Sequence, residues 1–169
     1  MSRSRPDPNT LTPVPAGAFR EACSHFATGV AVATVCASDG SSHGLTISSF
    51  VSVSLEPQLI LICVDAASSV HTTFCASPVF AINVLSEEQR QLSIDFAAVP
   101  EGRFERVAWH SEETGAPVIA EVLAWFECRV VNRIEAGDHS ILIGEVVGTG
   151  SRSGRPLLHF DRNYRELGN

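Results

Sequence analysis

Short apolar runs alternate with polar breaks along most of the chain, a pattern that is typical of a β-rich protein. Most of the runs are about four to eight residues long, the usual length of a strand. Gly, Pro, Asp and Ser cluster between them, so we expect hairpins between neighbouring strands. The predicted strands cover residues 30–37, 45–55, 58–64, 79–85, 124–134, 139–147 and 157–160.

A different spacing marks two helices in the first half of the chain. In the stretch AGAFREACSHFATG, apolar residues recur at helical spacing, and Gly29 is placed to end the helix. The residues of this predicted apolar face are Phe19, Ala22, Cys23 and Phe26. A second, shorter helix at 68–76 is predicted to cross between the strands at 58–64 and 79–85.

A capping box indicates a third helix. Ser86 and Gln89 have the required spacing, in which each side chain bonds the backbone N–H of the other residue. We expect a helix over 87–96 that presents Leu92 and Phe96 to the core.

The polar segment 97–117 contains Pro100, Gly102 and Gly115 and follows no strand or helix pattern. It is predicted to be a long surface excursion with Trp109 as its large anchor. Excursions of this length are often functional.

About six or seven strands with only two or three helices favour an antiparallel β-barrel, because parallel strands need a crossover helix after almost every strand. Closure of the barrel would also remove exposed strand edges. No GxGxxG follows a strand and no GxxxxGK[ST] occurs, so neither a Rossmann site nor a P-loop is supported. We expect a flexible tail at 1–15 and one domain at 16–169.

Composition restricts where the protein acts. The chain has 169 residues, enough for one domain with a core, and no apolar run approaches the roughly 18 residues of a membrane span. The N-terminus lacks the apolar stretch of a secretory signal, so we expect a cytoplasmic protein. The five cysteines form no CxxC or CxxH arrangement, which predicts buried free thiols and no zinc site.

The charge distribution limits the ligands. A net charge of −7 and scattered arginines argue against a nucleic-acid partner. The chain contains no lysine, so a phosphate site would depend on Arg, His and backbone amides.

Three segments carry candidate chemistry. In the first, hydroxyls recur at the even positions Thr46, Ser48, Ser52 and Ser54. These positions share one face of a strand, where they could line a flat polar heterocycle. The same alternation is also that of an ordinary solvated strand face.

The second segment places Ser68 and Ser69 after a strand and before a short helix. The free N–H groups of a helix N-terminus suit a phosphate, although ordinary N-capping explains the serines equally.

The third segment is Gly137-Asp138-His139, a tight turn that could hold a histidine at the mouth of a cleft. A turn followed by a structural histidine is the alternative. No GxSxG or HExxH occurs and the six histidines lack ligand spacing, so hydrolase and metal chemistry are disfavoured.

In this order, FATGVAVAT, HGLTISSFVSVSLEPQLILICV, SSVHTTF, FAINVLSEEQRQLSIDFA, GAPVIAEVLAWFECRVV and AGDHSILIGEVV resemble the short-chain NAD(P)H:flavin reductase family, whose members serve two-component monooxygenases. The resemblance covers about Phe19 to Leu167. It implies an FMN-binding split β-barrel, a homodimer with the flavin near the subunit interface, and reduction of FMN or FAD by NADH or NADPH. A partner monooxygenase would receive the reduced flavin.

The resemblance also implies the site residues. The flavin ring and ribityl chain would meet Thr46, Ile47, Ser48, Ser49, Phe50, Ser52 and Ser54; the phosphate would meet Val64, Asp65, Ser68 and Ser69; the distal part of the flavin would meet Phe96, Arg103 and Phe104. Further cofactor contacts would come from Thr28, Gly29, Val30 and Tyr164. His139 would position the nicotinamide, and no residue would act as acid or base.

The departures from the family pattern are modest. Ser48 stands where many relatives have Asn and Gln58 where they have Pro, while Ser77-Pro78 and His159 replace a Gly and a Tyr. The Ser48 difference leaves the choice between FMN and FAD open, and the lack of lysine slightly favours NADH over NADPH.

Two rival functions remain at this point. One is an oxidoreductase that keeps its flavin bound and acts on another small molecule. The other is a flavin-binding module without catalysis.

Overall fold

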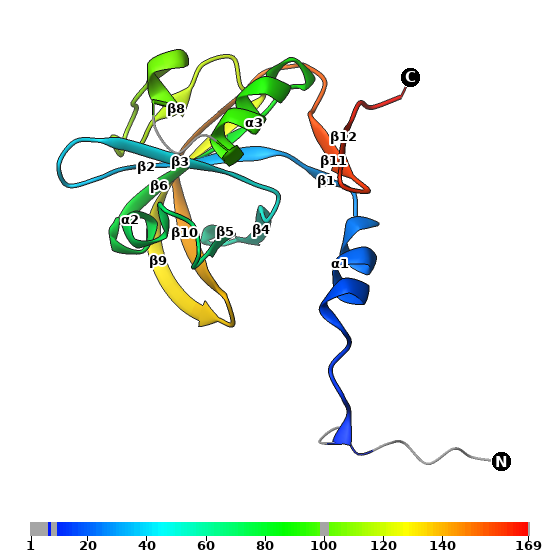
Figure 1. The fold of residues 1–169 in the computed structure, drawn as a ribbon. Coiled ribbons are helices and arrows are strands. Elements are labelled where there is room, and N and C mark those ends of the chain that lie inside the picture. Colours follow the sequence, from blue (N-terminus) through cyan, green and yellow to red (C-terminus); the bar gives the residue numbers. More distant parts are fainter. Residues whose placement is uncertain (1–6, 8–9, 99–101, 169) are drawn as a thin grey trace.

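The computed structural model describes residues 7, 10–98 and 102–168. Its body is a seven-stranded antiparallel sheet, curled into an open barrel in the order β3-β2-β6-β9-β10-β5-β4 (Figure 1). These strands are β2 (Ala31–Cys36), β3 (Ser42–Ile47), β4 (Val51–Leu55), β5 (Gln58–Asp65), β6 (Val79–Val84), β9 (Ala124–Ala136) and β10 (His139–Ser151). The prediction of a mostly β, antiparallel split-barrel fold is confirmed.

Strand β2 shows why the apolar runs are continuous and not alternating. Its residues 31–35 are all buried, because both faces of the strand are covered. Ala33 and Val35 belong to the apolar cluster inside the barrel, together with Phe80. Val32 belongs to a second cluster on the other face, which includes Phe96. A strand covered on both faces keeps few polar residues.

The predicted strand at 45–55 is wrong as a single element. β3 ends at Ile47 and β4 begins at Val51, and the two lie at opposite edges of the sheet. Among the described residues β3 and β4 do not pair, so the barrel is split along this line and the expected closure is absent. Because the chain changes edge here, Thr46 and Ser48 do not share a strand face with Ser52 and Ser54.

The first helix differs most from its prediction. α1 (Ala16–Ser24) ends well before Gly29, which lies instead in the short strand β1 (Thr28–Gly29). None of the helix residues is buried, and the Phe19 side chain is 60% exposed. The apolar face of α1 therefore does not cover the core of its own chain.

The other two helices follow their predictions. α2 (His71–Ala76) connects β5 to β6 and buries Phe74. α3 (Arg90–Ala98) follows the 3-10 turn η2 (Glu87–Gln89), which starts with the predicted capping box of Ser86 and Gln89. Phe96 of α3 is buried and Leu92 packs against the same cluster, as expected.

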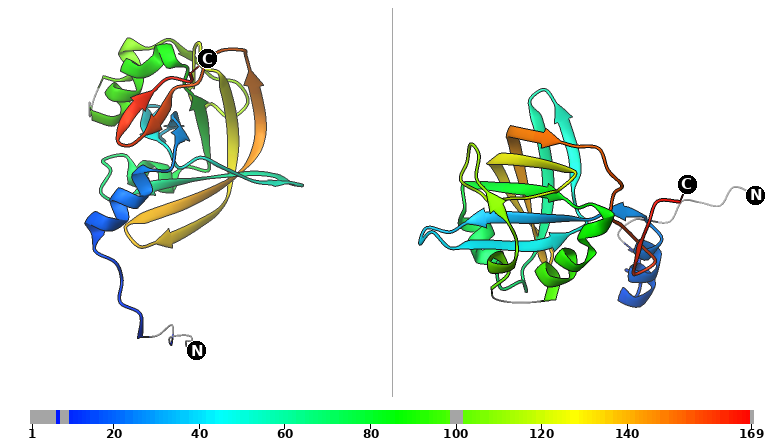
Figure 2. Two further views of the ribbon diagram at one scale, coloured as in Figure 1. Left: turned by 90° about the vertical axis from the view of Figure 1, so that its right-hand side faces the viewer. Right: turned by 90° about the horizontal axis from the view of Figure 1, so that it is seen from above.

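α1 belongs to a small unit beside the barrel, which we call the flanking unit (Figure 2). It also contains β1, β11 (Leu158–Phe160) and β12 (Asn163–Arg165), which form a sheet in the order β1-β11-β12. The backbone N–H of Asp161 donates to Ser24 O at 2.8 Å, and Arg162 forms an ion pair with Glu21. Two polar contacts thus join α1 to the turn between β11 and β12.

The predicted excursion at 97–117 includes η3 (Phe104–Arg106) and β7 (Trp109–His110), which pairs with β8 (Val118–Ile119); residues 99–101 lie outside the described residues. Trp109, the expected anchor, is 43% exposed. The anchor is instead Glu127 of β9, which is fully buried. Its carboxylate accepts hydrogen bonds from the backbone N–H groups of Glu113 and Thr114 and from the Thr114 hydroxyl, at 2.8, 3.0 and 2.7 Å.

Two composition-based expectations can be placed on the structure. The five cysteines are free thiols as predicted, but only Cys128 is buried. In the described part of the chain no helix is both long and apolar enough to cross a bilayer. Residues 1–6 and 8–9 of the predicted tail lie outside the described residues, and 11–15 are exposed without regular structure.

Candidate functional site

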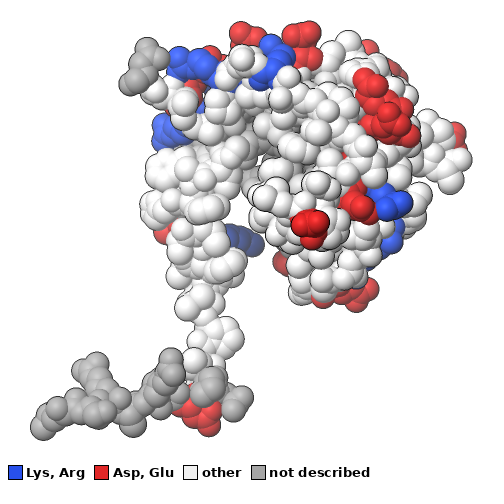
Figure 3. Space-filling view, turned by 180° about the vertical axis from the view of Figure 1, so that it is seen from behind, with Lys and Arg blue, Asp and Glu red and all other residues white. Residues whose placement is uncertain are grey.

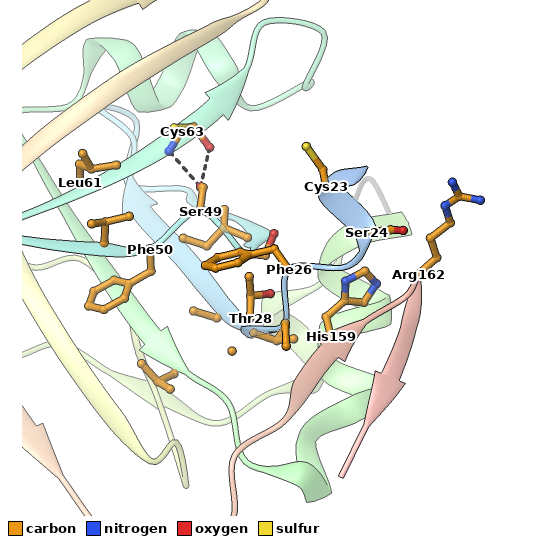
Figure 4. A pocket seen from close by; sticks show the side chains of 18 of the residues that line it. Cys23, Ser24, Phe26, Thr28, Ser49, Phe50, Leu61, Cys63, His159 and Arg162 are labelled. Carbon is orange, nitrogen blue, oxygen red and sulfur yellow. Dashed lines mark hydrogen bonds between the residues drawn. The ribbon is translucent and has the colours of Figure 1, made fainter. Parts of the chain in front are cut away.

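A cavity of about 880 Å³ lies between the barrel and the flanking unit, and we call it the main cavity. One wall consists of residues 47–51, at the split of the barrel, together with Leu61 and Cys63 of β5. The opposite wall consists of α1, residues 26–31 and two side chains of the C-terminal hairpin (Figure 4). Atoms around this hollow are largely uncharged (Figure 3), so the cavity suits a large, mostly apolar ligand.

Two distant stretches of the predicted site meet in the main cavity. The predicted site residues that line it are Thr28, Gly29, Val30, Ile47, Ser48, Ser49 and Phe50. The first three come from the flanking unit and its junction with β2, and the other four from the split. The remaining predicted residues lie outside this cavity.

The hydroxyl groups near the split differ in their hydrogen-bond partners. Ser49 Oγ donates to Cys63 O at 3.2 Å and accepts from Cys63 N at 3.0 Å, replacing a strand partner where β4 has not yet begun (Figure 4). Thr46 Oγ1 donates to Ser93 O at 2.6 Å. Ser48 is exposed and makes no side-chain hydrogen bond within the described residues. Of these three hydroxyls, only that of Ser48 is free for a ligand.

Thr28 presents an unsatisfied polar atom at the cavity wall. Its Oγ1 is buried and has no hydrogen-bond partner in the described part of the chain. A buried hydroxyl without a partner costs about 1–3 kcal/mol. A ligand with a polar edge in the main cavity would remove this cost.

Arg103 and Phe104 line a second cavity of about 260 Å³, which also includes Gly44 and Val70. The Arg103 guanidinium donates to Gly44 O and lies 6.0 Å from the centre of the Phe96 ring. Burial lowers the pKa of this guanidinium. The smaller cavity therefore offers a cation beside an apolar surface.

The serine turn is not a helix end. The N-cap of α2 is Val70 and its first residue is His71, so Ser68 and Ser69 follow β5 and precede the helix, as predicted, but lie in the turn before its N-cap and not at its first N–H groups. Ser68 Oγ accepts from Val70 N at 3.4 Å, and Ser69 is exposed. The helix has only six residues, so its dipole adds little at this place.

A backbone hydrogen bond joins the serine turn to the turn before β10, from Ala66 N to Asp138 O at 2.9 Å. His139, the first residue of β10, contacts Asp138 Oδ1 through Nδ1 at 2.7 Å. An ionised carboxylate only accepts hydrogen bonds, so Nδ1 carries the proton and Nε2 is left for a ligand. The hydrogen bond from His139 lowers the pKa of Asp138.

The other predicted residues line neither cavity. Val64 and Phe96 are buried in the two apolar clusters, so their side chains serve the core. The Tyr164 hydroxyl lies 2.8 Å from Ser93 Oγ. The remaining residues of this group are Ser52, which is exposed on β4, Ser54, whose Oγ accepts from Glu56 N, and Asp65, whose carboxylate accepts from Ala67 N.

Several cavity residues were not predicted as site residues. Among them are Arg20, Cys23 and Phe26 from the first helix and the link after it, and His159 and Arg162 from the C-terminal hairpin. The Phe26 side chain is 77% exposed and points across the cavity toward Ser49 (Figure 4). Helical spacing identified Phe26 as part of an apolar face, but spacing alone cannot separate a core face from a cavity wall.

The chain shares sequence and structure with known proteins. It is 43% identical over 155 residues to FMN reductase (NADH) of Agrobacterium fabrum, covering 89% of this chain and 87% of that protein. It is 46% identical over 129 residues to the stachydrine N-demethylase reductase subunit of Rhizobium meliloti, covering 76% of this chain. The structure of the Streptomyces globisporus NADH:FAD oxidoreductase matches with a TM-score of 0.87 at 36% identity, over 97% of this chain and 100% of that one.

Some relatives are much longer than this chain. It spans 56%, 42% and 41% of three proteins with 46%, 46% and 44% identity. Residues 23–168 match the family described as flavin reductase like domain. With this match and these identities, the chain belongs to the flavin reductase-like domain family.

Proposed function

We propose that the protein is an NAD(P)H:flavin oxidoreductase that reduces free FMN or FAD and supplies the reduced flavin to a partner monooxygenase. The observation that carries this proposal is the main cavity, which is large, mostly apolar and bordered by a few uncommitted polar groups. Hydride transfer from nicotinamide to flavin needs no protein acid or base at the reacting atoms. The contribution of the chain is then to position the two rings.

The residues of the cavity fit a flavin ring. Ile47 and Phe50 supply apolar surface, and the Ser48 hydroxyl and the orphaned Thr28 hydroxyl supply hydrogen-bonding groups. Ser49 holds the segment against β5, so the backbone groups of the split stay in a defined place.

The flavin phosphate is assigned to the turn of Ser68 and Ser69, with Arg103 in the neighbouring smaller cavity. Val70 follows the two serines and lines that cavity, so the turn and the guanidinium flank one region. The chain has no lysine, and Arg103 is the arginine among the residues that line this smaller cavity.

His139 is assigned to the nicotinamide, through the Nε2 atom that the contact with Asp138 leaves free. NADH is the proposed donor, in keeping with the names of the Agrobacterium and Streptomyces relatives.

A homodimer is part of the proposal. Phe19 of α1 is exposed, and β4 is an edge strand on which Val51, Val53 and Leu55 are exposed, Leu55 by 88%. Phe19 and Val51 line the main cavity, and an apolar edge strand requires cover. A second copy packed against them would close the cavity; sedimentation showing an active monomer at assay concentration would contradict this.

A monooxygenase partner is proposed because a relative from Acinetobacter baylyi, 44% identical over 128 residues, is named as the reductase component of a flavin-dependent trigonelline monooxygenase. The five free thiols fit the cytoplasm, a reducing compartment, as the place where this pair would work.

The test is NADH oxidation by the dialysed protein with FMN, FAD or no added flavin. If the protein is a flavin reductase, its rate saturates with added flavin. The dialysed protein itself is then colourless. A protein that remains yellow and ignores added flavin would be an oxidoreductase with bound flavin. No NADH consumption with either flavin would contradict any reductase function.

A further inference from the structure

We infer that Arg20 of α1 binds the diphosphate of the nicotinamide dinucleotide when the nicotinamide ring lies in the main cavity. This inference rests on the proposed function. It adds to the site a charged residue from the flanking unit, which lies outside the barrel.

The first observation is the charge balance of the cavity. Two arginines line it, Arg20 and Arg162. Arg162 is neutralised by its ion pair with Glu21. Arg20 makes no hydrogen bond or close ion pair within the described part of the chain. Its guanidinium is therefore the uncompensated cation in a cavity with mostly apolar walls.

The second observation is the direction in which this charge acts. The pKa of Asp138 is lowered mainly by the hydrogen bond from His139, and the charge of Arg20 contributes in the same sense. Arg20 has the smallest of the effects on Asp138, so this contribution only supports the placement that the cavity lining gives to Arg20. His139, the proposed contact of the nicotinamide, follows that turn and lies outside the lining of the main cavity, so the ring would extend from the cavity toward the turn. In a nicotinamide dinucleotide only one ribose separates the ring from the diphosphate.

Asp138 is the acidic group that would compete for Arg20. Its carboxylate is already bound to His139 Nδ1 at 2.7 Å and forms no close ion pair with Arg20. The nearest acidic neighbour along α1, Glu21, is occupied by Arg162. A diphosphate carries more charge than one engaged carboxylate and accepts two parallel hydrogen bonds from a guanidinium, so it is the stronger partner.

The test compares two hydride donors with the Arg20→Ala variant. NADH has the diphosphate, whereas 1-benzyl-1,4-dihydronicotinamide has the same reacting ring without ribose, diphosphate or adenosine. Loss of a hydrogen-bonded cation should raise the KM for NADH by about tenfold or more, because a hydrogen bond to a charged group changes the binding affinity by at least about that factor. The rate with the benzyl donor should stay unchanged, and Arg20→Lys should recover part of the loss.

Arg165→Ala is the matched control, because this exposed arginine of β12 lines neither cavity and its removal changes the net charge equally. It should leave the KM for NADH unaltered. Added salt should raise the KM for NADH of the wild type and affect Arg20→Ala less. Flavin affinity and the melting temperature of Arg20→Ala should match those of the wild type, since α1 buries no residue.

Two results would overturn the inference. If Arg20→Ala slows both donors equally, Arg20 shapes the cavity and does not bind the diphosphate. If it slows neither, Arg20 does not contact the cofactor. A wild-type protein that is inactive with both donors and all flavins would instead contradict the proposed function itself.

Discussion

The barrel and the flanking unit border the same cavity but are held together in different ways. In the barrel, two buried polar side chains are held by several hydrogen bonds: Asn83 donates to Val32 O at 3.1 Å and accepts from Ile119 N at 2.7 Å, and Glu127 accepts three hydrogen bonds. In the flanking unit, α1 buries no residue. In the described part of the chain, the polar ties of α1 to other elements are the ion pair with Arg162 and the backbone bond from Asp161, both to the turn between β11 and β12. Tyr164 of β12 in turn contacts Ser93 of α3 at 2.8 Å.

This difference indicates that the barrel provides most of the stability, whereas the flanking unit provides a wall of the cavity that can move. Segments with few buried contacts open at low free-energy cost, whereas core strands open only with global unfolding. A cavity with one firm wall and one lightly attached wall can admit a large ligand and then close around it. Bound cofactor or a second copy would add the contacts that α1 lacks, so both should stabilise the flanking unit more than the barrel.

The largest expected contrast is in thiol reactivity. Burial and the neighbouring carboxylate of Glu127 raise the pKa of Cys128 from 9.0 to about 12, whereas Cys23 on α1 is exposed. Only thiolates react, so at mildly alkaline pH the thiolate fraction of Cys128 is about a thousandfold lower than it would be at its ordinary pKa of 9.0. Mass spectrometry after treatment with a thiol reagent should find Cys23 modified early and Cys128 only on unfolding. Equal rates in the native protein would mean that the barrel opens as easily as the flanking unit.

Removal of the buried carboxylate of β9 should be the most damaging single substitution. Glu127→Ala leaves the N–H groups of Glu113 and Thr114 without their acceptor, which should lower the free energy of unfolding by about 3 kcal/mol and the melting temperature by roughly 6–12 °C. The control is Glu145→Ala, which breaks a surface ion pair with Arg129 and should cost less than about 1 kcal/mol. If Glu127→Ala and Glu145→Ala lower the free energy of unfolding equally, in thermal and denaturant unfolding, Glu127 is not the anchor of the long excursion.

A pair of glycines compares packing in the two regions. A Cβ on Gly144 of β10 would lie 2.7 Å from both Cys128 Cβ and Phe80 Cζ, so Gly144→Ala should destabilise the fold by about 1–3 kcal/mol. A Cβ on Gly29 of the flanking unit would meet no atom within 4 Å, and Gly29→Ala should change stability by less than about 0.5 kcal/mol. Denaturant titration measures both, and a larger loss for Gly29 would reveal packing that the described residues do not provide.

The smallest effect concerns the turn between β9 and β10. His139→Ala removes the hydrogen bond that lowers the pKa of Asp138, so this pKa should rise toward its ordinary value of about 3.9. Because the folded pKa is the lower one, the contact stabilises the fold above pH of about 3.9 and is lost as the pH falls through the folded pKa. Carboxyl NMR titration reports the shift. An unchanged pKa would remove the argument that His139 Nε2 is the free nitrogen.

Kinetics of the same variant test whether His139 contacts the nicotinamide. His139→Ala should raise the KM for NADH, with a loss of roughly 1–2 kcal/mol in transition-state binding, and leave flavin affinity nearly unchanged. Steady-state kinetics with each substrate varied separately measure both quantities. A joint loss of flavin affinity and thermal stability, at constant NADH kinetics per folded site, would show a structural histidine.

Local patterns were sufficient for most of the elements. The apolar runs at 58–64 and 79–85 became β5 and β6, and the capping box of Ser86 and Gln89 starts the helical segment that ends in α3. These features depend on neighbours in the sequence, through strand propensity and hydrogen bonds to nearby backbone groups. The resemblance carried by the same segments also led to the family.

Long-range contacts decided the rest. Nothing local in residues 48–50 ends a strand; the break exists because β3 and β4 lie at opposite edges, and Ser49 fills the gap beside Cys63. Helical spacing marked an apolar face on α1, but whether that face meets a core, a ligand or another chain depends on elements distant in the sequence. Glu127 alternates like a surface residue and is buried because Glu113 and Thr114 bring N–H groups to it. Sequence thus determined which segments are strands and helices, whereas tertiary structure decided which face each presents to the core and to the cavity, because burial depends on partners that no local pattern specifies.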